Sequence, residues 1–500
     1  MSALPAMLAD NPRLDLWVNF AAPGRVTISI GRVEIGQGVL TAMAQVAAEE
    51  LDVAVERISI RSGDTDLTPN EGYTAGSQSM QMGGVALRQA CADARGLFLD
   101  RGAQLLGRAK AELTVRDGRI LCDGKPTAHD YWSLAPSVVL ATDATGTAPR
   151  KSVVGRDTAR LDQPAKVLGQ PVFIHDMKLD GMAHARVVRQ PNRGAILASV
   201  DEQAIRRAAR EPVAFVRHGN FLAIVSDSET AVEAAAAVAS AHTIWNGAES
   251  PAPLQQEANW LLQRPAIDRV IGEPAAAEPS RGLQTLEATY TRPHLAHASI
   301  APSCGLAIYS DGHLTVWTHC QGVYPLRAAL ARTLRLDPST ISVRHVQGPG
   351  CYGHNGADDA ATDAAVIALR MPGRPIRVRW REFVFEPVSP AMVVKVSAKV
   401  DDACRPVDWT TEIWSGTHQG RPGGGATLLA AEALPDPPPI PAPIDIPEGA
   451  GGGATRNGAA LRHCIEKNCP SSRDGNAEAH VRLARSRRDA ERLCARIFHG

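Results

Sequence analysis

Hydrophobic periodicity separates strands from helices in the first third of the chain. Apolar and polar residues alternate over Arg25–Ile35, as in a strand with one buried face. After Gln37–Gly38, the residues Met43, Ala47 and Leu51 recur every four positions, which predicts a helix. The same reasoning predicts, in chain order, a strand at Arg57–Arg61, a polar loop at Ser62–Ser79, a helix with Leu87, Cys91, Ala94 and Phe98 on one face, and a tight hairpin at Asp117–Gly118.

Strands and helices also intermix in the rest of the chain. Residues 151–245 are expected to form a compact α/β unit, and the Pro-, Ala- and Gln-rich Asn246–Arg281 a connecting segment before a third unit. The elements expected in the second and third units are strands at His184–Val188, Phe221–Val225, Ile341–Val346, Ile376–Trp380 and Met392–Val400, helices at Glu202–Ala209, Glu229–Ala241, around Leu326, Leu330 and Leu334, and from Asp358, and a hairpin at Asp311–Gly312. The predicted fold class is therefore α+β, with several domains.

The composition is that of an ordinary globular protein. The 500 residues allow about three domains, and 44% of them are hydrophobic while 21% are charged. Lys+Arg and Asp+Glu each number 53, so the net charge gives no reason to expect nucleic acid or an anionic membrane as a partner. No run of about 18 apolar residues and no secretory signal is visible, so we expect no membrane span. The nine widely spaced Cys favour reduced thiols in the cytoplasm.

The segment Gly36–Gln37–Gly38 lies at a predicted strand-to-helix turn. The first turn of a helix offers unpaired backbone N–H groups and the positive end of the helix dipole, which suits a phosphate. The Gln37 side chain adds an amide that both donates and accepts. A plain glycine turn remains the alternative, because glycine commonly marks turns.

The loop that follows, Gly63–Ser79, is rich in hydroxyl groups and glycine. Hydroxyls without clustered Lys predict a neutral means of holding a phosphate or a polar heterocycle, while a solvated surface loop is the alternative. Its hydroxyl-bearing residues are Thr65, Thr68, Thr74, Ser77 and Ser79, and its glycines Gly72 and Gly76 allow close backbone approach.

A second glycine-rich loop precedes the helix expected from Asp358. Its glycines are Gly348, Gly350, Gly353 and Gly356. The loop has neither the Walker nor the dinucleotide spacing, so it predicts backbone packed against some other ligand. Asp358 and Asp359 in the first helical turn favour capping over acid–base chemistry. The histidines His294, His297, His319, His345 and His354 lack metal-ligand spacing and are interpreted as structural.

Taken together, these segments resemble the molybdopterin-binding large subunit of the xanthine dehydrogenase and aldehyde oxidase family. Val33–Asp66 resembles the family's cofactor contact region, and Glu71–Ser79 its hydroxyl-rich companion loop. Their early position in the chain is similar to the permuted order of the nicotinate and isoquinoline dehydrogenase branch. Residues 151–245, opening with Asp162–Gly169, resemble the family's α/β hammerhead domain.

The resemblance implies a set of cofactor-contacting residues. Trp317–Val323 matches the strand and turn that bring a Gln near the cofactor, and Gly350–Gly353 stands where the family has a Gly-Gly-Phe-Gly loop, so that Tyr352 takes the aromatic place beside the substrate. The cofactor-binding residues expected are Gly36, Gln37, Gly38, Thr74, Gly76, Ser77, Ser79, Gln321, Gly350, Cys351, Tyr352 and Gly353. No side chain is expected to ligate the metal, because the pterin dithiolene does so.

The resemblance also divides the chain into segments. The expected ranges are a first molybdopterin-binding segment at 1–148, the hammerhead domain at 149–255, a second molybdopterin-binding segment at 256–457 and a non-family tail at 458–500. The family continues beyond this point with a late Gly-x-Gly-Glu that carries the catalytic carboxylate, and we find none here, so no catalytic residue is assigned. We expect a C-terminally truncated chain whose tail reads in a shifted frame. A genuine amphipathic tail, with Val481, Leu483, Leu493 and Ile497 on one face, is the alternative.

The implied function is that of the molybdenum cofactor-binding subunit of an oxidoreductase. Such an oxidoreductase hydroxylates N-heteroaromatic or aldehyde substrates with oxygen from water. The cofactor implied is molybdopterin, in the cytosine dinucleotide form, with molybdenum. The partner implied is a small subunit with two-iron two-sulfur clusters, which receives the electrons. Whether this chain is itself an enzyme stays open, and we expect it to be inactive alone. Two other interpretations are an inactive remnant that binds only cofactor or a partner subunit, and a nucleotide-binding protein.

Overall fold

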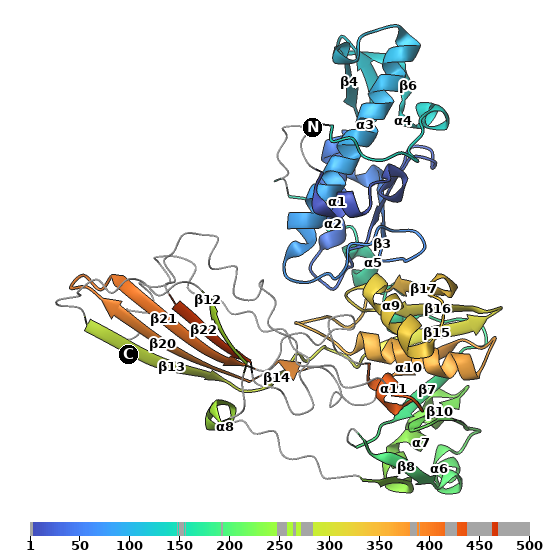
Figure 1. Ribbon diagram of the computed structural model, residues 1–500. Coiled ribbons are helices and arrows are strands. Elements are labelled where there is room, and N and C mark those ends of the chain that lie inside the picture. The colour runs from blue at the N-terminus through green and yellow to red at the C-terminus, as the bar shows by residue number, and fades with distance from the viewer. Residues whose placement is uncertain are drawn as a thin grey trace.

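The computed structural model describes most of the chain, with gaps. The described residues are 4–147, 149, 155, 157–191, 194–247, 258–263, 267–271, 284–380, 388–389, 391–415, 428–437 and 463–468. Helices and sheets are mixed throughout, as Figure 1 shows, which confirms the predicted α+β class. The Arg381–Phe383 segment, the Pro-rich 438–457 and most of the tail lie outside the described residues.

The N-terminal part packs two long helices on a small sheet. Strand β2 (Val26–Ile30) pairs with β1 (Val18–Asn19) on one side and, in parallel, with β3 (Ile58–Ser62) on the other. Helices α2 (Val39–Leu51) and α3 (Val85–Leu106) cover it, preceded by α1 (Ala6–Asp10). The predicted face of α3 is confirmed, because Leu87, Cys91, Ala94 and Phe98 are all buried. The predicted strand Arg25–Ile35 was too long, since β2 already ends at Ile30.

A three-stranded sheet stands at the far end of α3. It consists of β4 (Leu113–Arg116), β5 (Arg119–Cys122) and β6 (Lys125–Asp130), followed by α4 (Tyr131–Leu134). The predicted hairpin is confirmed: Asp117 and Gly118 both have positive φ, 46° and 77°, as a two-residue hairpin turn requires.

The central part is a seven-stranded sheet with the order β17-β16-β15-β18-β7-β10-β9. These strands are β7 (Ala183–Val188), β9 (Ala214–His218), β10 (Phe221–Ser226), β15 (Cys304–Ser310), β16 (His313–Thr318), β17 (Ile341–His345) and β18 (Ile376–Arg379). Strands from the predicted second and third units thus share one sheet, joined where β18 runs parallel to β7. Helices α9 (Val323–Leu334) and α10 (Ala357–Arg370) pack on it and begin directly after two of the predicted site segments.

Smaller elements complete the central part. Helices α6 (Glu202–Ala209) and α7 (Glu229–Ala239) lie beside a two-stranded sheet of β8 (Ile196–Val200) and β11 (Thr243–Asn246). The other short elements are the π-helix Ser79–Gly84, α5 (Gln163–Val167), α8 (Ala258–Leu262), α11 (Leu429–Ala433), and the paired β14 (Leu295–Ala296) and β19 (Val388–Ser389). Among the helices that the structure describes, none is both long and apolar enough to cross a bilayer.

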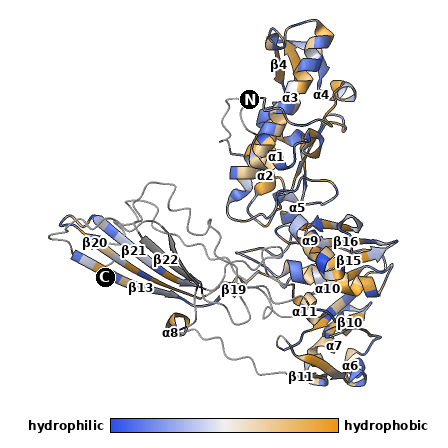
Figure 2. Cartoon of the chain, viewed as in Figure 1, coloured by the Kyte–Doolittle hydropathy of each residue, from blue (hydrophilic) through white to orange (hydrophobic). Residues whose placement is uncertain are grey.

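A five-stranded sheet with the order β12-β22-β21-β20-β13 forms the third part. Its strands are β12 (Ile267–Ile271), β13 (Gln284–Arg292), β20 (Met392–Val400), β21 (Pro406–Ser415) and β22 (His463–Asn468). Along β13 and β20, hydrophilic and hydrophobic residues alternate (Figure 2). Strand β22 belongs to the predicted non-family tail and pairs with both β12 and β21. The frameshift origin of that tail stays a prediction.

Candidate functional site

An internal carboxylate occupies the N-terminus of α2. Glu34 is buried, and its Oε1 accepts hydrogen bonds from the N–H groups of Gly36 (2.9 Å) and Gly38 (2.8 Å), while Oε2 accepts one from Leu40 (3.3 Å). The sequence analysis expected these amides to be free for a phosphate. The structure corrects that expectation, because Glu34 already uses them.

The Gln37 side chain forms hydrogen bonds to the backbone of the turn that contains it. Its Oε1 accepts from the Ile35 N–H (2.7 Å) and its Nε2 donates to the Val33 carbonyl (3.0 Å). Gly36 has a φ of 111°, and a Cβ built on it would meet nothing within 4 Å. The turn is therefore rigid, and the open approach for a ligand lies at Gly36.

Arg160 reaches the same turn from a distant segment. Its guanidinium donates to the Gly36 carbonyl (3.0 Å), pairs with Asp162 (2.8 Å) and lies 3.6 Å from Glu34. The pairing with Asp162 raises the pKa of Arg160, and the Arg160 and Lys166 cations lower the pKa of Asp162 to about 2 although burial opposes that shift. The sequence analysis missed Arg160, since nothing in its spacing links it to residues more than a hundred positions earlier.

Thr74 joins the hydroxyl-rich loop to both neighbouring segments. Its Oγ1 accepts from the Val33 N–H (2.9 Å), its N–H donates to the Gln321 carbonyl (2.8 Å), and its carbonyl accepts from Gln321 Nε2 (3.0 Å). This reciprocal pairing brings two predicted site residues together although 247 positions separate them. The residues of the first two loops and the Gln321 turn are thus contiguous.

The rest of the hydroxyl-rich loop is more open. Gly76 and Ser77 are exposed and have φ near +60°, and Ser79 begins the π-helix that leads into α3. Within the part of the chain that the structure describes, the hydroxyls of Ser77 and Ser79 have no hydrogen-bond partner. They are available to a ligand.

A buried ion pair supports this loop from inside. Arg32 and Glu71 are at most 1% exposed, and Arg32 Nε lies 3.5 Å from Glu71 Oε1. Glu71 Oε2 accepts from the N–H groups of Gly31 (2.7 Å) and Arg32 (3.3 Å), and the Arg32 guanidinium donates to the Tyr73 carbonyl. Burial lowers the pKa of Arg32 and raises the pKa of Glu71, while their mutual attraction opposes both shifts. The pair fixes the residue directly before Thr74.

The third loop, Gly350–Gly353, has a strained backbone that only glycine adopts readily. Gly350 has a φ of 99° and Gly353 of 145°. The Gly350 carbonyl accepts from Asn355 Nδ2 (3.2 Å), which anchors the loop to the start of α10. Tyr352 between the two glycines is 63% exposed, an unusual position for a large aromatic ring.

His319 connects this loop to the Gln321 turn. Its Nε2 lies 3.1 Å from the Cys304 N–H and its Nδ1 lies 3.1 Å from Asn355 Nδ2. Because the Cys304 N–H donates to Nε2, that nitrogen carries no proton, and burial favours the same neutral form by lowering the pKa of His319 to about 3. His319 is therefore neutral, and these contacts give it the structural role that the sequence analysis favoured.

The acidic residues at the start of α10 behave differently from expectation. Asp358 and Asp359 do lie in the first turn, but the Asp359 Oδ1 accepts from the Leu429 N–H of α11 (2.7 Å), so it ties two helices together. Burial, with help from the nearby Asp363 and Asp358 carboxylates, raises the pKa of Asp359 to about 7.

Replacing Asp359 by asparagine is expected to stabilise the fold at alkaline pH. A raised carboxyl pKa contributes stability below the unfolded value of 3.8, and that stability is lost as the pH rises through the folded value of about 7. Asparagine keeps an acceptor for Leu429 without the charge. Urea unfolding should show the variant gaining about 3 kcal/mol over wild type between pH 4.5 and pH 8. The exposed Asp180→Asn is the control, and an equal difference at both pH values would contradict the assignment.

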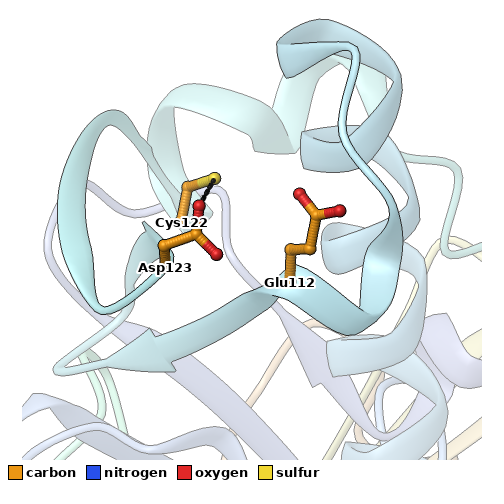
Figure 3. A group of neighbouring side chains, drawn as sticks. All are labelled: Glu112, Cys122 and Asp123. Carbon is orange, nitrogen blue, oxygen red and sulfur yellow. Dashed lines mark hydrogen bonds between the residues drawn. The ribbon is translucent and has the colours of Figure 1, made fainter.

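A separate group of potential metal ligands lies at the β4–β5 end of the molecule. Glu112, Cys122 and Asp123 place their ligand atoms within 4.8 Å of one another (Figure 3). Glu112 also lies 3.5 Å from Arg108, and the Asp123 N–H bonds to the Glu112 carbonyl (3.1 Å). The group contains no histidine and belongs to a different part of the fold from the glycine loops, so we do not include it in the candidate site.

Comparison with known proteins gives two domain matches. Residues 4–168 match one domain family described as molybdopterin cofactor-binding, and residues 266–403 match a second family with that description. The first match contains the Gly36–Gly38 turn and the hydroxyl-rich loop. The second contains Gln321 and Gly350–Gly353.

Individual relatives extend these matches. The chain is 31% identical to a nicotinate dehydrogenase subunit of Pseudomonas putida over 453 residues, which cover 86% of this chain and 37% of that protein. It is 25% identical to an isoquinoline 1-oxidoreductase subunit of Brevundimonas diminuta, over 79% of this chain and 58% of that protein. The aldehyde oxidoreductase structure from Desulfovibrio gigas aligns with a TM-score of 0.49 and 12% identity, over 89% of this chain and 49% of that one. The chain thus spans less than two thirds of each of these proteins.

Proposed function

The chain belongs to the molybdopterin-binding large subunits of the xanthine dehydrogenase family, and we propose that it binds the molybdenum cofactor of a hydroxylase. The proposed substrates are N-heteroaromatic compounds or aldehydes, and the oxygen comes from water. The bound cofactor would supply the oxygen transfer and accept the electrons. The chain's own residues would bind it, orient it and shape the place of the substrate.

The observation that carries the proposal is the gathering of three distant loops by two contacts. The Thr74–Gln321 pair joins the first two loops, and the His319–Asn355 contact joins the Gln321 turn to the third. The residues there fit a polar cofactor with a flat ring system: open space faces Gly36, and the hydroxyls of Ser77 and Ser79 lack partners among the described residues. The proposed contacts are those predicted from the sequence, namely Gly36, Gln37, Gly38, Thr74, Gly76, Ser77, Ser79, Gln321, Gly350, Cys351, Tyr352 and Gly353.

The contacts of Glu34 at the N-terminus of α2 make the Gly36–Gly38 turn a poor phosphate site. Because the Gly36 and Gly38 amides already pair with Glu34, a phosphate near this turn would meet a carboxylate and be repelled. The Gly76–Ser79 stretch offers free hydroxyls at the beginning of a long helix instead. We therefore assign the phosphate end of the cofactor to Ser77 and Ser79.

The wider assembly is part of the same proposal. A small subunit with two-iron two-sulfur clusters would receive the electrons, the cofactor would carry the cytosine dinucleotide, and the complex would work in the cytoplasm. The names of the Pseudomonas putida and Brevundimonas diminuta relatives describe each of them as a subunit. Two matches to cofactor-binding families do not favour the interpretation as an inactive remnant, nor the interpretation as a nucleotide-binding protein.

Gly36→Ala is expected to lower cofactor content at least threefold in the protein co-expressed with its small subunit. An added methyl group would enter the open space beside the turn and force a φ of 111° on alanine. Gly353→Ala should have the same effect, although its Cβ also meets the His297 ring. The measurements are molybdenum per protein and the fluorescence of the released, oxidised pterin.

The control is Gly107→Ala, which introduces a comparable left-handed strain (φ 62°) far from the loops. It should retain full cofactor content. Equal molybdenum in all three variants and wild type would contradict the proposed site. Nucleotide without molybdenum in the wild-type protein would favour the nucleotide-binding interpretation, and no bound molecule would favour the remnant.

A further inference from the structure

A cavity lies at the other end of the helices that follow the site loops. It has a volume of about 570 Å³ and opens between the C-terminal halves of α9 and α10 and the short helix α11. Its apolar lining residues include Ala329, Leu334, Val366, Leu369, Leu428, Ala431 and Leu434. Its volume falls in the range of small-molecule sites.

The lining of this cavity also contains three arginines and one aspartate. Arg332 and Arg370 are exposed, and neither has a carboxylate partner within the described ranges. Arg335 pairs with Asp436 at 2.8 Å, so its charge is balanced. Burial and the neighbouring Arg370 lower the pKa of His218, which leaves a neutral imidazole on the wall at physiological pH.

Helix stabilisation explains these arginines only in part. Cations at the last turn of a helix interact favourably with the helix dipole, and Arg332 and Arg370 lie in the last turns of α9 and α10. That role does not require the two side chains to border one apolar cavity. The combination of two unpaired guanidinium groups with an apolar lining matches the chemistry of an amphipathic anion.

We propose that this cavity binds a small carboxylic acid with an apolar body of about the size of a benzene ring. The ring would lie on Leu369, Val366 and Leu434, and the carboxylate would accept hydrogen bonds from Arg332 and Arg370. The site is distinct from the cofactor loops and does not depend on the proposed function.

Helices α9 and α10 run from the cofactor loops to the cavity, so the two sites lie at opposite ends of the same helices. Helix α9 begins two residues after Gln321 and has 12 residues, and α10 begins shortly after Gly353 and has 14. At 1.5 Å per residue these helices span about 18 Å and about 21 Å. A ligand in the cavity would therefore contact the C-terminal ends of α9 and α10, and the cofactor loops directly precede the N-terminal ends of these helices. The Asp359–Leu429 hydrogen bond adds a further link between α10 and α11.

Benzoate is the probe that tests the proposal, and benzyl alcohol is its neutral counterpart. Titration of the 500-residue chain, measured by calorimetry and by the thermal unfolding midpoint, should show that benzoate binds at least tenfold more tightly than benzyl alcohol. The double variant Arg332→Gln/Arg370→Gln should weaken benzoate binding at least tenfold. Both side chains are exposed, so the variant is expected to fold normally.

Three further variants locate the binding. Thr333→Phe, which fills the cavity from its wall, should abolish benzoate binding, whereas Arg61→Gln, which removes an equal charge elsewhere, should not change it. Tyr352→Ala tests the cofactor loops and should leave benzoate binding intact. Equal binding of benzoate and benzyl alcohol, or undiminished benzoate binding in the arginine double variant, would overturn the proposal. So would loss of binding in Tyr352→Ala alone.

Discussion

Replacing Glu71 by alanine is expected to destabilise the N-terminal part by about 3–5 kcal/mol, the usual cost of leaving one member of a buried ion pair alone. Arg32 is 0% exposed and would keep its charge without a counter-ion. The N–H groups of Gly31 and Arg32 would also lose their acceptor. Since Arg32 holds the Tyr73 carbonyl next to Thr74, the damage should reach the Thr74–Gln321 contact as well.

Chemical denaturation and cofactor content are the two measurements for this change. Glu71→Gln keeps an oxygen acceptor of the same shape, so it should lose less stability than Glu71→Ala. The double variant Arg32→Met/Glu71→Gln removes both charges and keeps an acceptor for the Gly31 and Arg32 N–H groups, so it should recover most of the stability, because no buried charge is left without a partner. A loss below about 1 kcal/mol in Glu71→Ala would show that water reaches Arg32 and that the pair is not a support for the loop.

Local sequence patterns predicted several of the helices, strands and turns. The strand Met392–Val400 and the helix Glu202–Ala209 have the bounds expected from their sequence, and the Asp117–Gly118 and Asp311–Gly312 hairpins form as predicted. Each depends on neighbouring residues alone: alternation, four-residue spacing, or a turn dipeptide. These local patterns predict an element without any knowledge of its tertiary contacts.

Contacts between distant residues could not be predicted in this way. Nothing in the spacing of Arg32 and Glu71 indicates that they pair, and no local rule joins Thr74 to Gln321 or β18 to β7. Glu34 is the instructive case. The sequence analysis treated the Gly36–Gly38 amides as free because glycine turns at helix starts bind anions, and it did not consider a carboxylate two residues earlier. An acidic residue directly before such a turn is a signal that could have been used.

Gly63 lies at one of the close contacts between the N-terminal part and the seven-stranded sheet. Gly63 is buried and has a φ of 59°, its N–H donates to the Ile30 carbonyl (3.0 Å), and its carbonyl accepts from the His345 N–H (2.7 Å). A Cβ on Gly63 would lie 2.5 Å from Val33 Cγ1 and 2.8 Å from His345 Cβ. Neither neighbour can move freely, because Val33 binds Thr74 and His345 belongs to β17.

Gly63→Ala is therefore expected to cost about 3 kcal/mol or more, the sum of left-handed strain and overpacking. Gly107→Ala has almost the same φ, 62°, but open space around the new methyl group, so it should cost only about 1 kcal/mol. The difference between the two variants in urea unfolding isolates the close approach at this contact. Because Val33 and Thr74 would shift with it, Gly63→Ala should also lower the cofactor content, while Gly107→Ala should not. Equal destabilisation of both variants would mean that the N-terminal part does not pack against β17 as the structure describes.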